Sequence, residues 1–255
     1  MMHLGQSGRV QSGVALAIVL VFLMLASLLA AAAAQTGIQE QKAARNLRDR
    51  DLAFAAAEAA LQDAETDIQQ APDRPRSRSA LFARDRTIGF PSSDASLCQR
   101  GDGNPWQGLC RAPSLAEAPA WLGTDLADDA QDVTVRFGRF TGRTMPTGAG
   151  ALPARPPRYL IEVLRDRQPG TKPQSPQYFY RVTAIGFGVD ARNQVVLQSF
   201  YRKADSNSGT PAASNSGGHA ASTTTVTTTL RLGRLGWREL GNWRELRNGL
   251  RSEAE

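Results

Sequence analysis

The sequence predicts an α+β fold, in which one long N-terminal helix packs on an antiparallel sheet of four or five strands. Three observations support this. An apolar run occupies residues 14–34, and a stripe of apolar residues at helical spacing follows it. Short segments rich in β-branched and aromatic residues then occupy the second half of the chain, separated by turn residues. The 255 residues suffice for one domain of ordinary size with appendages.

The first element is a transmembrane helix over residues 14–34, which contain one polar side chain, Ser27. At about 1.5 Å per residue the run spans about 30 Å, the thickness of the hydrocarbon core of a bilayer. A cleaved secretory signal is the alternative, because the alanines before Gln35 offer a small-residue cleavage site. Apolar segments of secretory signals are usually shorter than this one, which favours an uncleaved span.

Residues 35–71 are expected to continue the same helix as an amphipathic segment, which Pro72 and Pro75 end. Its apolar side chains follow one helix face and form a packing stripe. We expect Glu58, among alanines, on the flank of this stripe, solvated or in a salt bridge. The stripe consists of Leu47, Phe54, Ala57, Leu61, Ala64 and Ile68.

Residues 72–130 show weak periodicity and many turn residues, and we expect an irregular loop region. Its two cysteines, Cys98 and Cys110, bracket the turn-rich segment QRGDGNPWQGL. Such a pair fits a disulfide in an oxidising compartment, which would stabilise the fold by about 3 kcal/mol. Two unrelated free thiols are the alternative.

Residues 131–240 are expected to form the sheet domain. Candidate strands begin at Val133, Arg158, Tyr178, Gln194 and Thr223. A flexible insert rich in Ser, Gly, Ala and Asn, residues 204–222, separates the last two. In the tail, residues 241–255, the pattern of Trp243, Leu246 and Leu250 after Leu240 is amphipathic and suits docking on the domain or on a partner.

The charge pattern points two ways. The net charge of +6 permits contact with nucleic acid or anionic lipid, but a solvated basic surface explains it equally.

The basic residues around the span bear on its orientation. Arg9 is the one that precedes the span, and four follow it, Lys42, Arg45, Arg48 and Arg50, which favours a cytoplasmic C-terminal side. The cysteine pair favours an oxidising compartment for the C-terminal side. Because large domains can translocate against such a charge bias, we expect the C-terminal side to lie outside the cytoplasm.

No catalytic motif is present, so the chain is not expected to be an enzyme. Two cysteines with His3 and His219 far away in sequence do not provide the roughly four closely spaced ligands of a zinc site. Asp102 and Asn104 lie in a segment without the acidic ligands of a calcium loop. We therefore expect no metal, no cofactor and no catalytic residues, and the Arg and Trp residues of the tail do not indicate nucleic-acid binding.

Taken together, these segments resemble the PilX-type minor pilins of bacterial type IV pili. The short polar leader, residues 1–13, ends in Gly13 directly before the apolar run, as in type IV prepilins. The resemblance continues through QKAARNLRDRDLAFAAAEAAL and resumes at YLIEVL, YRVTAIGFG, VVLQSFYRK and GRLGWREL. Residues 72–157 and the insert lie outside this resemblance.

The resemblance implies a type IV pilin-like fold, insertion in the inner membrane with the C-terminal domain in the periplasm, and cleavage between Gly13 and Val14 by prepilin peptidase, with methylation of the new N-terminus. It implies a role with other minor pilins in starting pilus assembly, at or near the tip, with the major pilin as a further candidate partner. The fifth mature residue, Glu in major pilins, is Ile18 here, which suits an initiating subunit.

Two other classes of protein share some of these features. A type II secretion pseudopilin would have the same helix and sheet. A signal-anchored periplasmic binding protein or enzyme would have the span but no need for a cut after Gly13. The N-terminus of the mature chain distinguishes this last class from a pilin.

Overall fold

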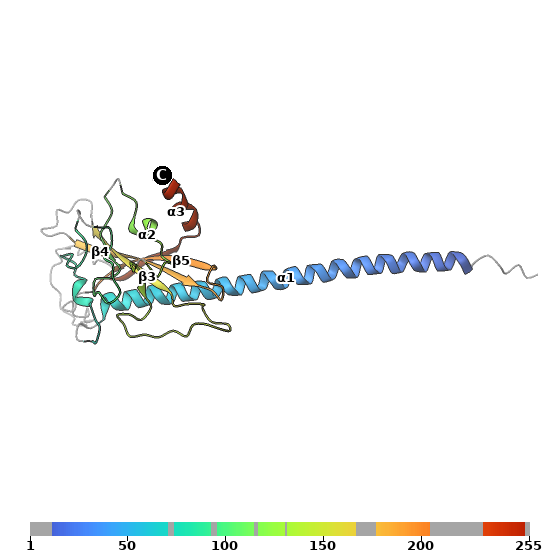
Figure 1. The fold of residues 1–255 in the computed structure, drawn as a ribbon, viewed down its shortest axis with the longest axis horizontal. Helices are drawn as coiled ribbons and strands as arrows, with labels where there is room; N and C mark the ends of the chain where they lie inside the picture. Colours follow the sequence, from blue (N-terminus) through green and yellow to red (C-terminus); the bar gives the residue numbers. More distant parts are fainter. Residues whose placement is uncertain are drawn as a thin grey trace, which may run out of the picture. The chain divides into compact units, whose positions relative to one another are not determined.

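The computed structural model describes residues 12–70, 74–92, 96–114, 117–130, 132–166, 177–204 and 232–252. The chain divides into two compact units, Met1–Arg48 and Asp49–Glu255. Helix α1 (Ser12–Gln69) contributes to both units (Figure 1). The remaining elements all belong to the second unit. They are the 3₁₀ helix η1 (Ser79–Leu81), β1 (Leu109–Cys110), α2 (Ala120–Gly123), β2 (Val135–Arg136), β3 (Arg158–Asp166), β4 (Gln177–Phe187), β5 (Gln194–Arg202), β6 (Gly233–Glu239) and α3 (Trp243–Ser252).

The first unit is described through the N-terminal part of α1, whose apolar side chains are exposed. Val14, Ile18 and Leu29 expose 62%, 50% and 72% of their surface. Within the described ranges, α1 is the helix that is long and apolar enough to cross a membrane. Its hydroxyl groups are satisfied inside the helix, because Ser27 Oγ donates to Met24 O at 2.8 Å and Thr36 Oγ1 donates to Ala32 O at 3.1 Å.

The second unit is a sheet with the order β1-β3-β4-β5-β6, and β2 also pairs with β3. Strands β3, β4, β5 and β6 form an antiparallel meander, of which the sequence predicts β3, β4 and β5. The sheet is mostly rather than wholly antiparallel, since β1 pairs with β3 in parallel. The predicted α+β fold, a long helix on a sheet, is confirmed.

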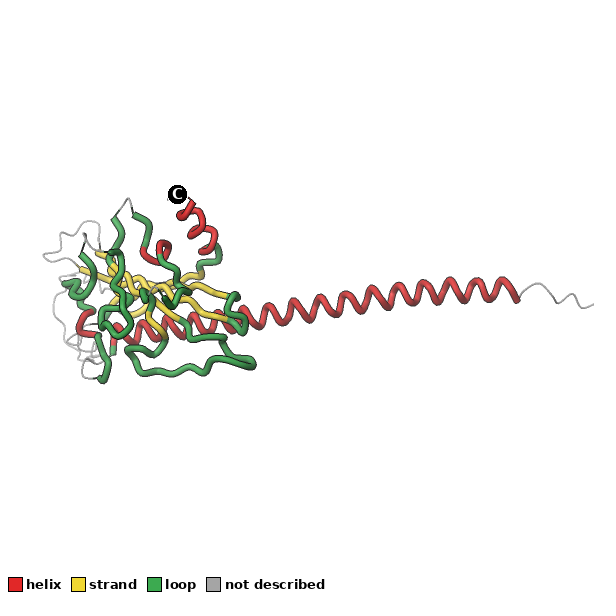
Figure 2. Tube along the Cα trace, viewed as in Figure 1, coloured by secondary structure: helices red, strands yellow, loops and turns green. Residues whose placement is uncertain are grey.

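The two faces of the sheet bury two different layers, as Figure 2 shows for α1 on one side and α2 with α3 on the other. Alternate strand residues such as Tyr159 and Tyr180 join Leu61 and Ile68 of α1 in one apolar cluster. Residues of opposite parity, such as Leu160 and Phe187, join a second cluster that includes the cysteines, α2 and the start of α3.

Several predicted boundaries shift. The strand expected from Val133 is limited to Val135–Arg136, and the last described strand is Gly233–Glu239, beyond the Thr-rich segment expected to form it. Residues 223–231 and all but the first residue of the 204–222 insert lie outside the described residues, as do residues 1–11 of the leader. The region 72–130 is not wholly irregular, because it contains η1, β1 and α2.

Candidate functional site

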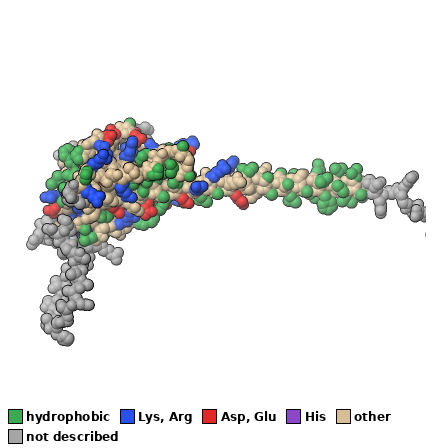
Figure 3. All heavy atoms as spheres, turned by 90° about the horizontal axis from the view of Figure 1, so that it is seen from below, with side chains coloured by type: hydrophobic (Ala, Val, Ile, Leu, Met, Phe, Trp, Pro, Cys, Tyr) green, Lys and Arg blue, Asp and Glu red, His purple; other side chains and the backbone are tan. Residues whose placement is uncertain are grey.

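The first candidate site is the N-terminal part of α1. Gly13 and Val14, where we expect cleavage, both lie within this helix. No charged residue occurs between Arg9 and Glu40, so Ile18 lies in an uncharged, exposed stretch. In the described residues of this unit no other element packs on it, and Figure 3 shows apolar side chains over its visible face.

The packing stripe divides at the boundary between the two units. Leu47, in the first unit, is 63% exposed. In the second unit Phe54 is half-buried and touches Trp237 of β6 edge to face at 5.9 Å between ring centroids. The stripe residues farther along α1 have no exposed surface, and they are Ala57, Leu61, Ala64 and Ile68.

Close approach of α1 to the sheet depends on small residues. A Cβ atom at Gly186 of β4 would lie 2.1 Å from Ala53 O and 2.3 Å from Ala57 N. Both distances are far below van der Waals contact, so a hydrogen is the largest substituent that fits there. The predicted stripe omitted Ala53 and Ala60, which are also fully buried.

Ion pairs lie along the flank of α1 that faces β6. Arg234 Nε lies 2.7 Å from Glu65 Oε1, and its Nη1 lies 4.0 Å from Glu58 Oε1. Arg50 Nη2 pairs with Glu239 Oε1 at 2.6 Å. Glu58 is therefore half-buried beside a guanidinium, on the flank of the stripe.

The predicted disulfide is confirmed. Cys98 and Cys110 are bonded, and both are buried. Backbone hydrogen bonds flank the bridge on each side, from Gln99 N to Leu109 O and from Arg111 N to Leu97 O, both 2.9 Å long. The bridge thus closes a short hairpin. One arm of this hairpin is β1, which pairs with β3 of the sheet.

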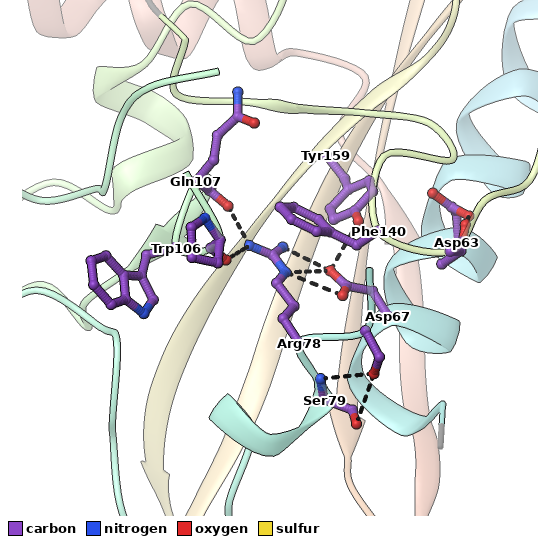
Figure 4. A network of polar contacts seen from close by, with 12 residues as sticks. Asp63, Asp67, Arg78, Ser79, Trp106, Gln107, Phe140 and Tyr159 are labelled. Atoms are coloured by element: carbon purple, nitrogen blue, oxygen red, sulfur yellow. Dashed lines mark hydrogen bonds and ion pairs between the residues drawn. The ribbon is translucent and has the colours of Figure 1, made fainter. Parts of the chain in front are cut away.

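A buried ion pair connects α1 to this hairpin (Figure 4). Arg78 Nη2 lies 2.7 Å from Asp67 Oδ2, and the two side chains are 2% and 0% exposed. Arg78 Nη1 also donates to Pro105 O and Gln107 O at 2.9 and 2.6 Å. One guanidinium therefore binds the C-terminal part of α1 and the disulfide loop at once.

Two rings complete the surroundings of this pair. The Arg78 guanidinium carbon lies 3.7 Å from the centroid of the Phe140 ring, a cation–π contact. Tyr159 Oη donates to Asp67 Oδ2 at 3.0 Å. Burial, together with the Asp67 carboxylate, raises the pKa of Tyr159 well above its ordinary value, so the phenol keeps the proton that it donates.

Asp63 is a second buried carboxylate on α1, one turn before Asp67. Its oxygens accept hydrogen bonds from Gly138 N, at 2.7 Å, and from the Thr141 hydroxyl. Burial raises the pKa of Asp63 despite these two donors, which act in the opposite direction. The carboxylate holds the turn after β2 against the helix.

The sequence reasoning missed these buried polar residues. The sequence contains a weak signal for them. Asp63 and Asp67 lie four residues apart, which is about one helical turn, on the helix face that otherwise carries the apolar stripe. A carboxylate on a buried helix face requires a partner. Nothing in the spacing identifies that partner as Arg78, which belongs to a different segment.

The geometry favours structural roles over chemistry. The described ranges hold no group of three or more His, Cys, Asp or Glu side chains that could bind a metal ion. A surface cavity of about 250 Å³ beside the disulfide loop is lined by Asp and Arg side chains that pair with one another, for example Arg139 with Asp102 at 3.6 Å and Arg158 with Asp129. Four of the charged side chains that line this cavity, Asp102, Asp129, Arg139 and Arg158, are thus already engaged.

Comparison with known proteins gave two family matches. A model described as "PilX N-terminal" matches residues 12–62, the helix segment. A model described as "Type IV pilus assembly protein PilX C-term" matches residues 94–203, which contain the disulfide loop and β1 to β5. None of the curated proteins and none of the solved structures matches the chain.

Proposed function

Because the chain belongs to the PilX family of type IV pilus assembly proteins, we propose that it is a minor pilin that starts pilus assembly together with other minor pilins, at or near the tip of the fibre. The observation that carries this proposal is the division of α1. Its second part packs in one apolar cluster of the sheet domain, and its first part exposes an apolar surface long enough for a bilayer or for the helices of neighbouring subunits.

Ile18 supports an initiating role. A carboxylate at this depth in a membrane costs about 2.5–3.5 kcal/mol unless it is paired. In a major pilin, a Glu at this position recovers that cost by pairing with the terminal amine of a neighbour. The chain has Ile18 instead, so it carries neither the cost nor the pairing requirement. A subunit of this kind rests stably in the bilayer before any fibre exists.

Processing and orientation belong to the same proposal. Cleavage by prepilin peptidase between Gly13 and Val14 leaves the entire apolar stretch on the mature chain, and methylation follows at Val14. The Cys98–Cys110 bridge supports a periplasmic sheet domain, because disulfides persist in oxidising compartments. The proposed partners are other minor pilins, the major pilin and, during processing, the peptidase.

The test is deletion in the native host with complementation. We expect surface pili to fall sharply, while the amount of major pilin in the inner membrane stays normal. The wild-type chain restores piliation. A Gly13→Ala chain tests processing, and mass spectrometry of its N-terminus shows whether it is still cut before Val14. We expect a chain that is not cut to leave piliation unrestored. Normal piliation in the deletion strain would contradict the initiating role, and a secretion defect there would identify a type II pseudopilin instead.

A mature chain that begins at Gln35 would instead identify an ordinary secreted protein and contradict the membrane-inserted minor pilin. This measurement is independent of pilus counts. It therefore separates an error about the class of protein from an error about its role in initiation.

A further inference from the structure

We propose that Lys42 and Arg45 bind the phosphate groups of anionic phospholipids, such as phosphatidylglycerol, at the membrane surface where α1 leaves the bilayer, and that Arg48 adds an attraction at longer range. We call these three residues the basic face. The inference rests on the membrane insertion proposed above, and it adds a lipid partner to it. It also accounts for a charge pattern that membrane orientation alone leaves unexplained.

The basic face is one continuous side of the helix. At about 100° per residue its three side chains fall within an arc of about 120°. All three are exposed, and in the described part of the chain none of them has an ion pair or side-chain hydrogen bond. Figure 3 shows basic side chains gathered on the helix beyond its apolar part.

The neighbouring charges on α1 are directed elsewhere. Glu40 lies about 140° around the helix from Arg45, so it does not neutralise the basic face. Asp49 accepts hydrogen bonds from Val189 N and, at 3.0 Å, from Asn193 Nδ2. Arg50 pairs with Glu239. Asp51, which is exposed, follows Arg48 by three residues, but in the described part of the chain no ion pair joins it, Glu40 or Asp49 to the three basic residues.

The position along the helix matches the headgroup layer. The uncharged stretch 14–39 is about 39 Å long, close to the 40–45 Å of a bilayer with its headgroups. With this stretch centred, the Lys42 backbone lies at the outer edge of the headgroups, and Arg45 and Arg48 lie about 4.5 and 9 Å farther. Helical side chains lean toward the N-terminus, so these cations reach back toward the phosphates.

A lipid fits this charge better than a second copy of the chain does. Residues 40–51 contain four basic and three acidic residues, but two of the acidic residues, Asp49 and Asp51, follow the basic face, and Glu40 alone precedes it. A parallel copy in the same register would place like charges together, which is unfavourable. Anionic headgroups supply the missing negative charge, and the region near Lys42 and Arg45 lies within about one Debye length of them at physiological salt.

The experiment measures which lipid gathers beside the basic face. A Gln39→Cys chain, purified without reductant so that the native disulfide stays closed, is labelled with a fluorophore. It is reconstituted in phosphatidylcholine vesicles that contain a minority of phosphatidylglycerol. Trace amounts of either lipid, carrying a nitroxide at the same acyl position, quench the fluorophore in proportion to local concentration.

We expect phosphatidylglycerol to be enriched over phosphatidylcholine by about fivefold, the equivalent of about 1 kcal/mol. The enrichment should vanish at 1 M salt, where the Debye length is about 3 Å. It should also vanish in the Lys42→Gln/Arg45→Gln/Arg48→Gln variant. The matched control Arg74→Gln/Arg86→Gln/Arg100→Gln removes the same charge from exposed residues elsewhere and should keep it.

Equal quenching by the two lipids would overturn the proposal, as would enrichment that persists in the basic-face variant. A second result would also overturn the proposal. If quenching does not depend on the lipid, and another pilin co-purifies with the wild-type chain from the native membrane but not with the basic-face variant, the basic face binds a protein partner. The vesicle measurement requires no pili, so its outcome is independent of the initiation test. Failure of the chain to insert at all would count against the proposed function.

Discussion

Arg78 and Asp67 form an ion pair with 2.7 Å between Nη2 and Oδ2, although their side chains are 2% and 0% exposed. Two charges without access to water are stable only when every polar atom finds a partner. Here the Tyr159 hydroxyl and the carbonyls of Pro105 and Gln107 supply the remaining partners. The pair therefore stabilises the junction of α1, the disulfide loop and β3 as long as it remains complete.

Removing one partner should be costly. We expect Arg78→Met to lower the free energy of unfolding by about 3–5 kcal/mol, because it leaves the Asp67 charge buried and uncompensated. Urea unfolding of the full chain in detergent micelles, followed by tryptophan fluorescence, measures this. The matched control is Arg192→Met, since the Arg192–Asp190 pair is exposed by 91% and 47% and should contribute little to stability. Equal effects of the two changes would refute the special role of the buried pair.

Gly186 should tolerate no side chain. A Cβ there would overlap the backbone of Ala53 and Ala57, so α1 must move away from β4. We expect Gly186→Ala to cost about 1–3 kcal/mol or more in the same unfolding assay. Gly236→Ala in β6 is the control, because no atom lies within 4 Å of the new methyl group, and it should be nearly neutral. A neutral Gly186→Ala would mean that the helix does not approach the sheet this closely.

The disulfide should contribute about 3 kcal/mol, which the Cys98→Ala/Cys110→Ala chain would lose. Alkylation gives a second readout. When the chain is isolated without reductant, no thiol should react with the alkylating reagent. After reduction, two thiols should react. Two reactive thiols before reduction would contradict the oxidised state and support a cytoplasmic sheet domain.

Asp63 gives a pH dependence with a definite sign. Burial raises its pKa above the ordinary value of 3.8, so the folded chain holds this proton more tightly than the unfolded chain. Protons bound in excess by the folded state mean that stability falls as pH rises from about 4 through the folded pKa. We expect the free energy of unfolding of wild type, relative to Asp63→Asn, to decrease over this range and then level off. A difference that grows with pH would show that the two hydrogen bonds outweigh burial.

The sequence predicted the long helix from its apolar run and the stripe that follows, and it predicted the strands β3, β4 and β5 from their β-branched and aromatic residues. It missed β6, where Gly233, Gly236 and two arginines give little β propensity, whereas the Thr-rich segment before it has much. It missed β1 because two residues have no periodicity. The two short strands and β6 owe their place to pairing with β3 and β5.

Some residues of the candidate sites could be predicted from the sequence, and others could not. The cysteines could be paired because the chain contains no other. The partner of Asp67 could not be identified, since a long-range ion pair depends on how loops return to the helix and leaves no spacing rule in the sequence. Leu47 belongs to the predicted stripe but is exposed within its own unit. Its part in the predicted packing stripe stays a prediction.

Ile18 gives the last prediction, which concerns the start of assembly. If the chain begins a fibre rather than joining one, it has no earlier subunit whose terminal amine a Glu could meet. Ile18→Glu then adds an unpaired carboxylate in the membrane at a cost of about 2.5–3.5 kcal/mol and gains no contact.

We expect the Ile18→Glu chain to restore piliation in a deletion strain no better than wild type, and more weakly where insertion is impaired. Ile18→Leu should restore it fully, and Ile18→Gln separates the effect of polarity from that of charge. Pili counted by electron microscopy, with membrane levels of each variant measured alongside, give the readout. An Ile18→Glu chain that makes more pili than wild type would mean that the subunit adds to an existing fibre, and the initiating role would then be wrong.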